Sequence, residues 1–414
     1  MMRIVAGGAA EKRVAALARR GSRLDQVEPA VRRIVEDVRK NGDRALRRYA
    51  ERWDGLKPKQ ALRVAEKEMQ AAQDAVSQEF RSALEKAAAR IRRFCEWQKP
   101  QEWRREADGV AVGQLVRPLD SVGCYVPGGR YPLPSTVLMT VIPAQVAGVR
   151  NIKVASPQPR PETLAAAAML GVKEFYRIGG AQAVAALAYG TRSVPRVDKI
   201  VGPGNLYVTA AKKRVAFDCA IDMLAGPTEV AIVSDTGEAR FIAADLVAQA
   251  EHDPEAIAVF ITSSRALAKE VREKVEKAAA GNATAQVSLR ANGAVLLASS
   301  RQQAMEWANR LAPEHITVSR ENVPYVTSAG SIFVGDYSPQ AAGDYASGPN
   351  HVLPTAGAAR YRGGLSVFDF VKLITFQELT AQGMRRIAPV VVPLAEAEGL
   401  RAHAESIRVR CANA

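Results

Sequence analysis

From about residue 117 onward, short β-rich runs alternate with apolar helical segments, and no other feature of the sequence constrains the fold as strongly. Four strands are expected at residues 121–126, 151–155, 175–178 and 199–201. Each is followed by an expected helix, at residues 136–147, 162–170, 181–189 and 206–215. Strands that alternate with helices of this length predict βαβ units and a parallel sheet.

A second set of strands and helices follows in the same alternating pattern. Its strands are expected at residues 229–234, 256–262, 294–298, 316–319 and 331–334, and its helices at residues 240–251, 266–279 and 302–311. The pattern therefore predicts an α/β fold of two tandem, incomplete, Rossmann-like doubly wound modules. Apolar residues at helical spacing before about residue 105, and a helical pattern from Val367 to the end, predict helical N-terminal and C-terminal extensions.

Composition and charge narrow the functional class. The 57 Lys and Arg exceed the 43 Asp and Glu, but they are scattered and lack interleaved aromatic residues, so we expect no nucleic-acid partner. No apolar run approaches the ~18 residues of a membrane span, and the start lacks the apolar core of a signal peptide, so we expect no membrane partner. The four cysteines are widely separated, which is typical of reduced thiols and predicts a cytoplasmic protein.

The four histidines all lie in polar clusters, at His252, His315, His351 and His403. Imidazole both ligates metals and titrates near neutrality, so metal binding and proton transfer are the two roles to weigh. Gln249 and His252 are three residues apart on an expected helix and share one face, which would suit zinc or manganese. Further ligands would come from Asp344, His351 or His403, and the alternative is a polar helix end facing solvent.

Glu314 and His315 follow a proline between an expected helix and an expected strand, where an α/β sheet can expose residues at a crevice. Adjacent residues on an extended segment point in opposite directions. One could therefore remove a proton from a substrate while the other positions a water molecule. The alternative is a histidine that compensates the dipole at a helix C-terminus.

Three glycine-rich turns each follow an expected strand and precede an expected helix, at residues 127–129, 179–182 and 202–205. Such turns suit phosphate groups because the backbone can approach closely and helix N-termini point at the anion. The polar residues Tyr125, Gln182 and Asn205 lie in or beside them, which favours a dinucleotide over plain tight turns. Between the two modules, a Gly-Pro-Thr corner ends at Thr228, which could hold a substrate hydroxyl or amine or act only as a rigid hinge.

Taken together, these motifs resemble the histidinol dehydrogenase family, which is a family of zinc enzymes. The likeness is carried by Gly-Cys-Tyr-Val-Pro-Gly-Gly from Gly123, Ile-Gly-Gly-Ala-Gln-Ala from Ile178, Gly-Pro-Gly-Asn from Gly202, Asp-Met-Leu-Ala-Gly-Pro from Asp222, Gln-Ala-Glu-His-Asp from Gln249, Ala-Pro-Glu-His from Ala312, Gly-Asp-Tyr-Ala-Ser-Gly-Pro-Asn-His-Val-Leu-Pro-Thr from Gly343 and Glu-Gly-Leu-Arg-Ala-His from Glu398. The motifs stretch over most of the chain and keep the order of the family.

The resemblance implies a role for each matching residue. It implies that Glu314 and His315 form the catalytic pair. It implies zinc ligands at Gln249, His252, Asp344 and His403, and an NAD site lined by Tyr125, Gln182 and Asn205. The implied substrate contacts are these four ligands and His315, together with Ser135, Thr228, His351 and Glu398. Thr228 stands where the family often has serine, and the hydroxyl is retained.

The resemblance also implies the reaction and the assembly. L-histidinol would be oxidised through L-histidinal to L-histidine, the last step of histidine biosynthesis, with a hydride passed to NAD at each step. The C-terminal tail would reach across a domain-swapped homodimer, so that His403 and Glu398 complete the partner's site.

The domains expected on this basis are four. Residues 1–25 form a helical extension, residues 26–118 with 230–366 form the first α/β module with the metal and catalytic residues, residues 119–229 form the NAD-binding module, and residues 367–414 form the swapped tail.

Two other functions compete with this one. A relative that oxidises another hydroxylated compound, such as a sulfonated diol, is disfavoured because the carboxylate of Glu398 would repel a sulfonate. A non-catalytic metal- or nucleic-acid-binding protein would keep the ligands but would need neither the Glu314–His315 pair nor the glycine-rich turns.

Overall fold

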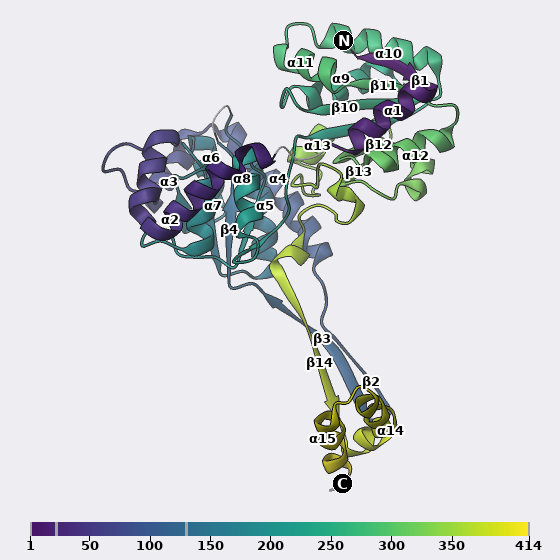
Figure 1. The fold of residues 1–414 in the computed structure, drawn as a ribbon. Coiled ribbons are helices and arrows are strands. Elements are labelled where there is room, and N and C mark those ends of the chain that lie inside the picture. Colours follow the sequence, from purple (N-terminus) through teal and green to yellow (C-terminus); the bar gives the residue numbers. More distant parts are fainter. Residues whose placement is uncertain (1, 21–23, 129–130, 413–414) are drawn as a thin grey trace.

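The computed structural model describes residues 2–20, 24–128 and 131–412. Figure 1 shows two α/β lobes beside each other and a long arm that leaves them and ends in a helical pair. The expected mixed α/β fold with parallel sheets is confirmed. Within the described residues, no helix is both long and apolar enough to span a membrane.

One lobe is built on a six-stranded parallel sheet with strand order β1-β11-β10-β9-β12-β13. These strands are β1 (Arg3–Ala6), β9 (Glu229–Val233), β10 (Ile257–Thr262), β11 (Ala294–Leu297), β12 (His315–Val318) and β13 (Ser331–Val334). Helices α9 (Ala239–Ala250), α10 (Arg265–Ala278) and α11 (Ala283–Ala291) share one apolar cluster with this sheet. Helices α1 (Gly7–Ala18) and α12 (Arg301–Leu311) share a second cluster, so both faces of the sheet are covered.

The other lobe is built on a five-stranded parallel sheet with strand order β6-β5-β4-β7-β8. These strands are β4 (Ser121–Tyr125), β5 (Asn151–Ala155), β6 (Glu174–Tyr176), β7 (Lys199–Val201) and β8 (Ala220–Ile221). On one face lie α2 (Leu24–Trp53), α7 (Gly180–Tyr189) and α8 (Leu206–Val215). On the other lie α3 (Glu66–Ala75), α4 (Gln78–Gln98), α5 (Pro134–Ala147) and α6 (Pro161–Met169).

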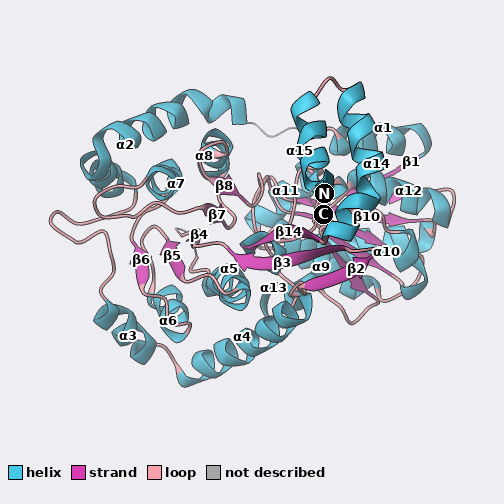
Figure 2. Cartoon of the chain, turned by 90° about the horizontal axis from the view of Figure 1, so that it is seen from below, coloured by secondary structure: helices cyan, strands magenta, loops and turns pink. Residues whose placement is uncertain are grey.

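The arm is a three-stranded antiparallel sheet that carries a helical pair. Its strands are β2 (Trp103–Ala107), β3 (Val110–Pro118) and β14 (Val371–Leu379), and its helices are α14 (Ala381–Ala397) and α15 (Arg401–Ala412). In Figure 2, which views the molecule from below, the arm sheet and its two helices lie in front of the lobes. The short elements η1 (Arg320–Tyr325), α13 (Gln340–Tyr345), η2 (Ala358–Arg360) and η3 (Val367–Phe370) belong to the connections between β12 and β14.

The structure groups the segments differently from the expected domains. Helices α2, α3 and α4 were expected beside residues 230–366, but they pack on the five-stranded lobe. Helix α2 packs on α7 and α8, α3 packs on α6, and α4 packs on α5. The segment 1–25 was expected to be helical only, but it begins with β1, which pairs with β11 at the sheet edge. Apolar helix stripes do not encode which partner they cover, so periodicity alone could not decide this grouping.

The prediction of a purely helical C-terminal tail was also wrong for the beginning of that segment. Residues 371–379 form β14, which pairs along its whole length with β3 in antiparallel register, from Val371 opposite Pro118 to Leu379 opposite Val110. The segment has the β-branched and aromatic residues of a strand, and its pairing partner lies far away in the sequence. The tail is therefore a strand followed by two helices.

Candidate active site

The candidate catalytic residues lie at the amino ends of two neighbouring strands. His315 is the first residue of β12 and pairs in register with Val230 of β9. Glu314 immediately precedes β12 and Thr228 immediately precedes β9. All three residues therefore lie at the end of the sheet where these two parallel strands begin. Both Glu314 and His315 are buried, with 7% and 4% of their surface exposed.

Glu314 is held by one of its carboxylate oxygens. The hydroxyl of Thr228 donates to its Oε2 at 2.5 Å, and the backbone N–H of Glu229 donates to the same oxygen at 3.0 Å. Burial raises the pKa of Glu314 to about 8, although both hydrogen bonds act in the opposite direction. A carboxyl with such a pKa can take up and release a proton near neutral pH, as an acid–base group must.

The hydrogen bond of His315 determines which ring nitrogen is available. Its Nδ1 lies 3.1 Å from the carbonyl oxygen of Glu229. A carbonyl can only accept, so Nδ1 carries the proton and the lone pair of the neutral ring is on Nε2. Nε2 faces Asp344, whose Oδ1 is 4.0 Å away, and burial lowers the pKa of His315. The ring is therefore held neutral, with Nε2 able to accept a proton.

Two of the four candidate metal ligands, Gln249 and Asp344, lie next to this pair. Gln249 is buried near the end of α9, and its amide Nε2 contacts the hydroxyl of Thr228. His252 follows in the turn after α9 and is exposed. Asp344 lies in α13, and its carbonyl oxygen accepts a hydrogen bond of 2.9 Å from Nδ1 of His351.

The fourth candidate ligand lies elsewhere. His403 is exposed on α15, and Glu398 is exposed at the C-cap of α14. Figure 1 shows these helices at the far end of the arm, away from both lobes of their own chain. Across the described part of the chain, no three His, Cys, Asp or Glu side chains converge as a metal site. Oxygen and nitrogen donors suitable for zinc are thus present beside the catalytic pair, but the set is incomplete within one chain.

The candidate NAD residues lie on the five-stranded lobe. Tyr125 ends β4, and its hydroxyl accepts a hydrogen bond of 3.1 Å from the backbone N–H of Gly180. Gln182 is buried in α7. Asn205 caps α8, where its side-chain oxygen accepts from the N–H groups of Tyr207 and Val208 at 3.0 and 3.1 Å.

The turns around these residues require glycine at particular points. Gly202 has φ +113, and a Cβ there would lie 2.1 Å from the carbonyl oxygen of Tyr125. The backbone of the turn can therefore approach the end of β4 only without a side chain. Of the first predicted turn, residues 127–128 are described, whereas Gly129 lies outside the described residues.

A cavity of about 130 Å³ joins the two halves of the site. Gly202, Pro203 and Gly204 line it from the five-stranded lobe. Thr228, Glu314 and His351 also line it, so the third glycine-rich turn and Glu314 face the same cavity. Ser135 lies buried at the start of α5, next to Thr136, whose hydroxyl is 3.3 Å from Nε2 of His351.

The sequence did not point to two buried contacts of these residues. Thr136 contacts His351, and Asp54 accepts hydrogen bonds from the N–H of Gly179 at 2.9 Å and from Nε2 of Gln182 at 3.0 Å. Asp54 ends the first long helical region and resembles any polar residue after a helix. Only the packing of α2 on α7 brings its carboxylate to the glycine-rich turn.

Comparison with known proteins identifies the family of this site. The family model described as histidinol dehydrogenase matches residues 17–411. The histidinol dehydrogenase of Bacillus cereus is 46% identical over 399 residues, which cover 93% of each chain. That of Methanothermobacter thermautotrophicus is 47% identical over 401 residues, which cover 94% of each chain. The chain belongs to the histidinol dehydrogenase family.

A solved structure supports the same conclusion. The histidinol dehydrogenase of Elizabethkingia anophelis is similar to this chain with a TM-score of 0.94 and 36% identity, covering 100% of this chain and 98% of that one. The family resemblance of the sequence motifs is therefore confirmed, and membership of the histidinol dehydrogenase family places this chain among the oxidoreductases and in histidine biosynthesis.

Proposed function

We propose that this chain oxidises L-histidinol through L-histidinal to L-histidine and passes one hydride to NAD in each of the two steps. The observation that carries the proposal is the shared cavity, which brings Glu314 and His351 together with the glycine-rich turn at residues 202–204. A hydride acceptor held at that turn would lie beside Glu314. The names of the relatives agree with this substrate.

Each proton has a place to go in this arrangement. In the first step, Nε2 of His315 takes the hydroxyl proton of the alcohol while the carbon loses its hydride to NAD. In the second step, Glu314 accepts a proton from the water that adds to the aldehyde, and His315 returns its proton to the aldehyde oxygen, which gives the hydrate and leaves the ring of His315 neutral. His315 then deprotonates the hydrate as the second hydride leaves to NAD. Burial of both side chains limits the access of bulk water to the aldehyde between the steps.

We propose Zn²⁺ as the metal, held by Gln249, His252 and Asp344 together with the partner subunit's His403. When bound, zinc would fix the pose of the amine and imidazole of the substrate. The chain's own part is to hold these groups beside His315, with Ser135, Thr228 and His351 as further substrate contacts. Tyr125, Gln182 and Asn205 are proposed to line the NAD site.

We propose a homodimer in which the arm of each chain completes the site of the other. The arm exposes apolar side chains that a monomer would leave in water. Val390 and Leu394 of α14 are each 61% exposed, and Leu373 of β14 is 46% exposed. Contact with a partner subunit would bury them and would bring the partner subunit's Glu398 to the substrate. A cytoplasmic location is proposed because all four cysteines are free thiols.

The test is NADH formation with L-histidinol on zinc-loaded protein and on a chelated sample. Zinc-dependent NADH formation that ends in L-histidine is the expected result. Zinc bound at stoichiometric level with no NADH formed would reject L-histidinol as the substrate. The variant His315→Asn, which cannot accept the alcohol proton, serves as the control for background reduction of NAD.

A further inference from the structure

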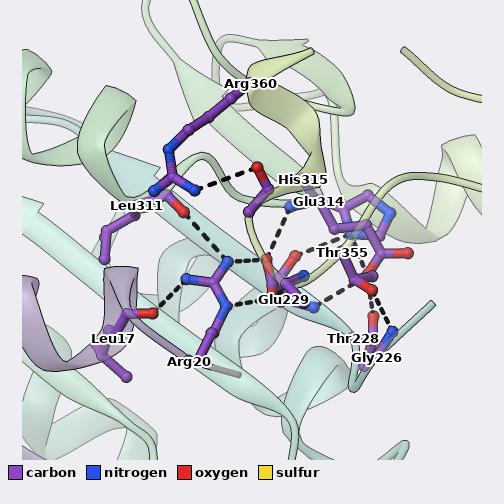
Figure 3. Close-up of polar contacts among 12 residues, drawn as sticks. Leu17, Arg20, Gly226, Thr228, Glu229, Leu311, Glu314, His315, Thr355 and Arg360 are labelled. Carbon is purple, nitrogen blue, oxygen red and sulfur yellow. Dashed lines mark hydrogen bonds and ion pairs between the residues drawn. The ribbon is translucent and has the colours of Figure 1, made fainter. Parts of the chain in front are cut away.

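A buried ion pair lies directly behind the catalytic residues. Glu229 is the first residue of β9, and its side chain is 1% exposed. Arg20 follows α1 near the N-terminus, and its side chain is 15% exposed. The guanidinium contacts both carboxylate oxygens, Nε with Oε1 and Nη2 with Oε2, in the parallel geometry drawn in Figure 3. Such bidentate pairs are geometrically specific as well as strong.

Arg20 is itself held by the ends of two helices. Its Nη1 donates to the carbonyl oxygen of Leu17 at 2.6 Å, and its Nη2 donates to that of Leu311 at 3.1 Å. These carbonyls close α1 and α12, the two helices on one face of the six-stranded sheet. The guanidinium therefore has one orientation, set by elements from opposite ends of the chain.

Glu229 is connected to both catalytic residues by three hydrogen bonds. Its backbone N–H donates to Oε2 of Glu314 at 3.0 Å, and its own Oε2 accepts from the backbone N–H of Glu314 at 3.3 Å. Its carbonyl oxygen accepts from Nδ1 of His315 at 3.1 Å. The side-chain rotamer of Glu314 and the tautomer of His315 thus both depend on where this one residue lies.

We propose that Arg20 and Glu229 are positioning residues, which hold the carboxylate of Glu314 and the imidazole of His315 in their reacting orientation. Both carboxylate oxygens of Glu229 are taken by Arg20 and by backbone N–H groups, so the pair acts through the two catalytic residues and not on the substrate. The inference rests on the proposed function of Glu314 and His315.

A carboxylate is required at position 229 because both of its oxygens accept from the backbone. Oε1 accepts from the N–H of Ala356 at 2.9 Å, and Oε2 accepts from that of Glu314. An amide would turn one acceptor into a donor in either orientation and would leave one of these buried N–H groups unpaired. Burial raises the pKa of Glu229 and the charge of Arg20 opposes the rise, so the arginine also favours the acceptor form.

The test compares three single variants as zinc-loaded, full-length protein. Arg20→Lys keeps the positive charge but loses the planar guanidinium that contacts both carboxylate oxygens. Glu229→Gln keeps the shape of the side chain but loses one hydrogen-bond acceptor. Glu11→Ala is the matched control, because Glu11 accepts from Trp307 at 2.6 Å and pairs with Arg310 at 2.7 Å. It therefore loosens the same packing of α1 on α12 without touching Glu229.

We expect Arg20→Lys and Glu229→Gln to lower kcat by on the order of 10- to 100-fold while the KM for NAD and the zinc content stay unchanged. Glu11→Ala should lower the melting temperature and leave kcat unchanged. If Arg20→Lys loses thermal stability and keeps its kcat, or if Glu11→Ala loses kcat to the same extent, the pair is only a structural tie and the proposal is rejected.

A second readout does not depend on the substrate. With four histidines in the chain, ¹⁵N-histidine labelling gives four imidazoles, and the signal of His315 is identified by its loss in His315→Gln. That signal should shift in Arg20→Lys and not in Glu11→Ala. An unshifted signal rejects the positioning role. A wild-type protein that is inactive on L-histidinol would reject the proposed function, and the NMR comparison would still decide on the pair.

Discussion

Glu314 combines deep burial with a hydrogen-bonded carboxyl, and this combination has a measurable effect on stability. Its pKa is raised from 4.5 to about 8 in the folded chain, so the folded state binds a proton that the unfolded state has released. The raised pKa of Glu314 adds to the free energy of unfolding. This contribution is fully present below pH 4.5 and is lost as the pH rises through about 8.

The variant Glu314→Gln removes this dependence. We expect it to be more stable than the wild type at pH 9, on the order of 1–3 kcal/mol, because no buried charge has to form. The difference should shrink as the pH falls toward 5. Urea unfolding of metal-free protein at both pH values measures it. An equal stability difference at the two pH values would contradict the raised pKa.

Thr228 links the candidate metal side of the site to the catalytic side. Its hydroxyl donates to Glu314 and accepts from the amide of Gln249. We expect Thr228→Ser to keep kcat near the wild-type value because both contacts survive. Thr228→Val should lose ~1–3 kcal/mol of stability and most of the activity, because a buried amide N–H is left unpaired. Thermal unfolding and steady-state kinetics of the two variants, compared side by side, test this.

At the scale of residues, the sequence pointed to a candidate site but not to the residues that support it. Glu314 and His315 became candidates because histidine is rare in this chain and adjacent acid–base residues are conspicuous. Arg20 and Glu229 were missed because an arginine after a helix and a glutamate before a β-rich run carry no local signal. They become a pair only through the pairing of elements that are distant in sequence.

At the scale of elements, α8 carries a residue with two possible roles. Asn205 caps this helix with two hydrogen bonds and is also a proposed NAD contact. Asn205→Asp should keep the cap and the melting temperature, but its negative charge should raise the KM for NAD by repelling the phosphates. Asn205→Ala should lose ~1 kcal/mol of stability. If Asn205→Asp leaves the KM for NAD unchanged, Asn205 is a helix cap and not a cofactor contact.

The strands and helices of the two lobes were predicted well because their periods are clear, whereas the arm was not. The strand β14 follows a short 3₁₀ turn and precedes α14, and its residues alternate only weakly between buried and exposed. A two-sided strand on an extended arm lacks the buried face on which sequence patterns depend.

The position of the site also differs from the usual rule for open α/β sheets. Glu314 and His315 lie at the amino ends of their strands, and not at the carboxyl ends.

At the scale of the whole molecule, the arm predicts complementation between two inactive variants. His315→Asn disables the site of its own chain, whereas His403→Ala disables the site that its arm would complete in the partner. In a mixed dimer, one site then carries both defects and the other carries none. Co-expression should restore activity to about a quarter of the wild-type level, because half of random dimers are mixed and one of their two sites is intact.

The control for this experiment is the pair His315→Asn and Glu314→Gln, which alter the same lobe. Their mixed dimers carry one defect in each site, so no activity should return. If His315→Asn and His403→Ala also fail to complement each other in dimers shown to be mixed by mass spectrometry, His403 does not serve the partner's site.

The first strand of the chain has a consequence for the order in which the protein matures. Ile4 of β1 pairs with Val295 of β11, so β1 cannot join its sheet until the chain through β11 has left the ribosome. The strands of the five-stranded lobe lie between these points, so its sheet can form earlier. Arg20 follows β1 and reaches its carboxylate only when that late closure occurs. A nascent chain of this topology therefore acquires its reacting centre later than the sheet of the lobe proposed to bind NAD.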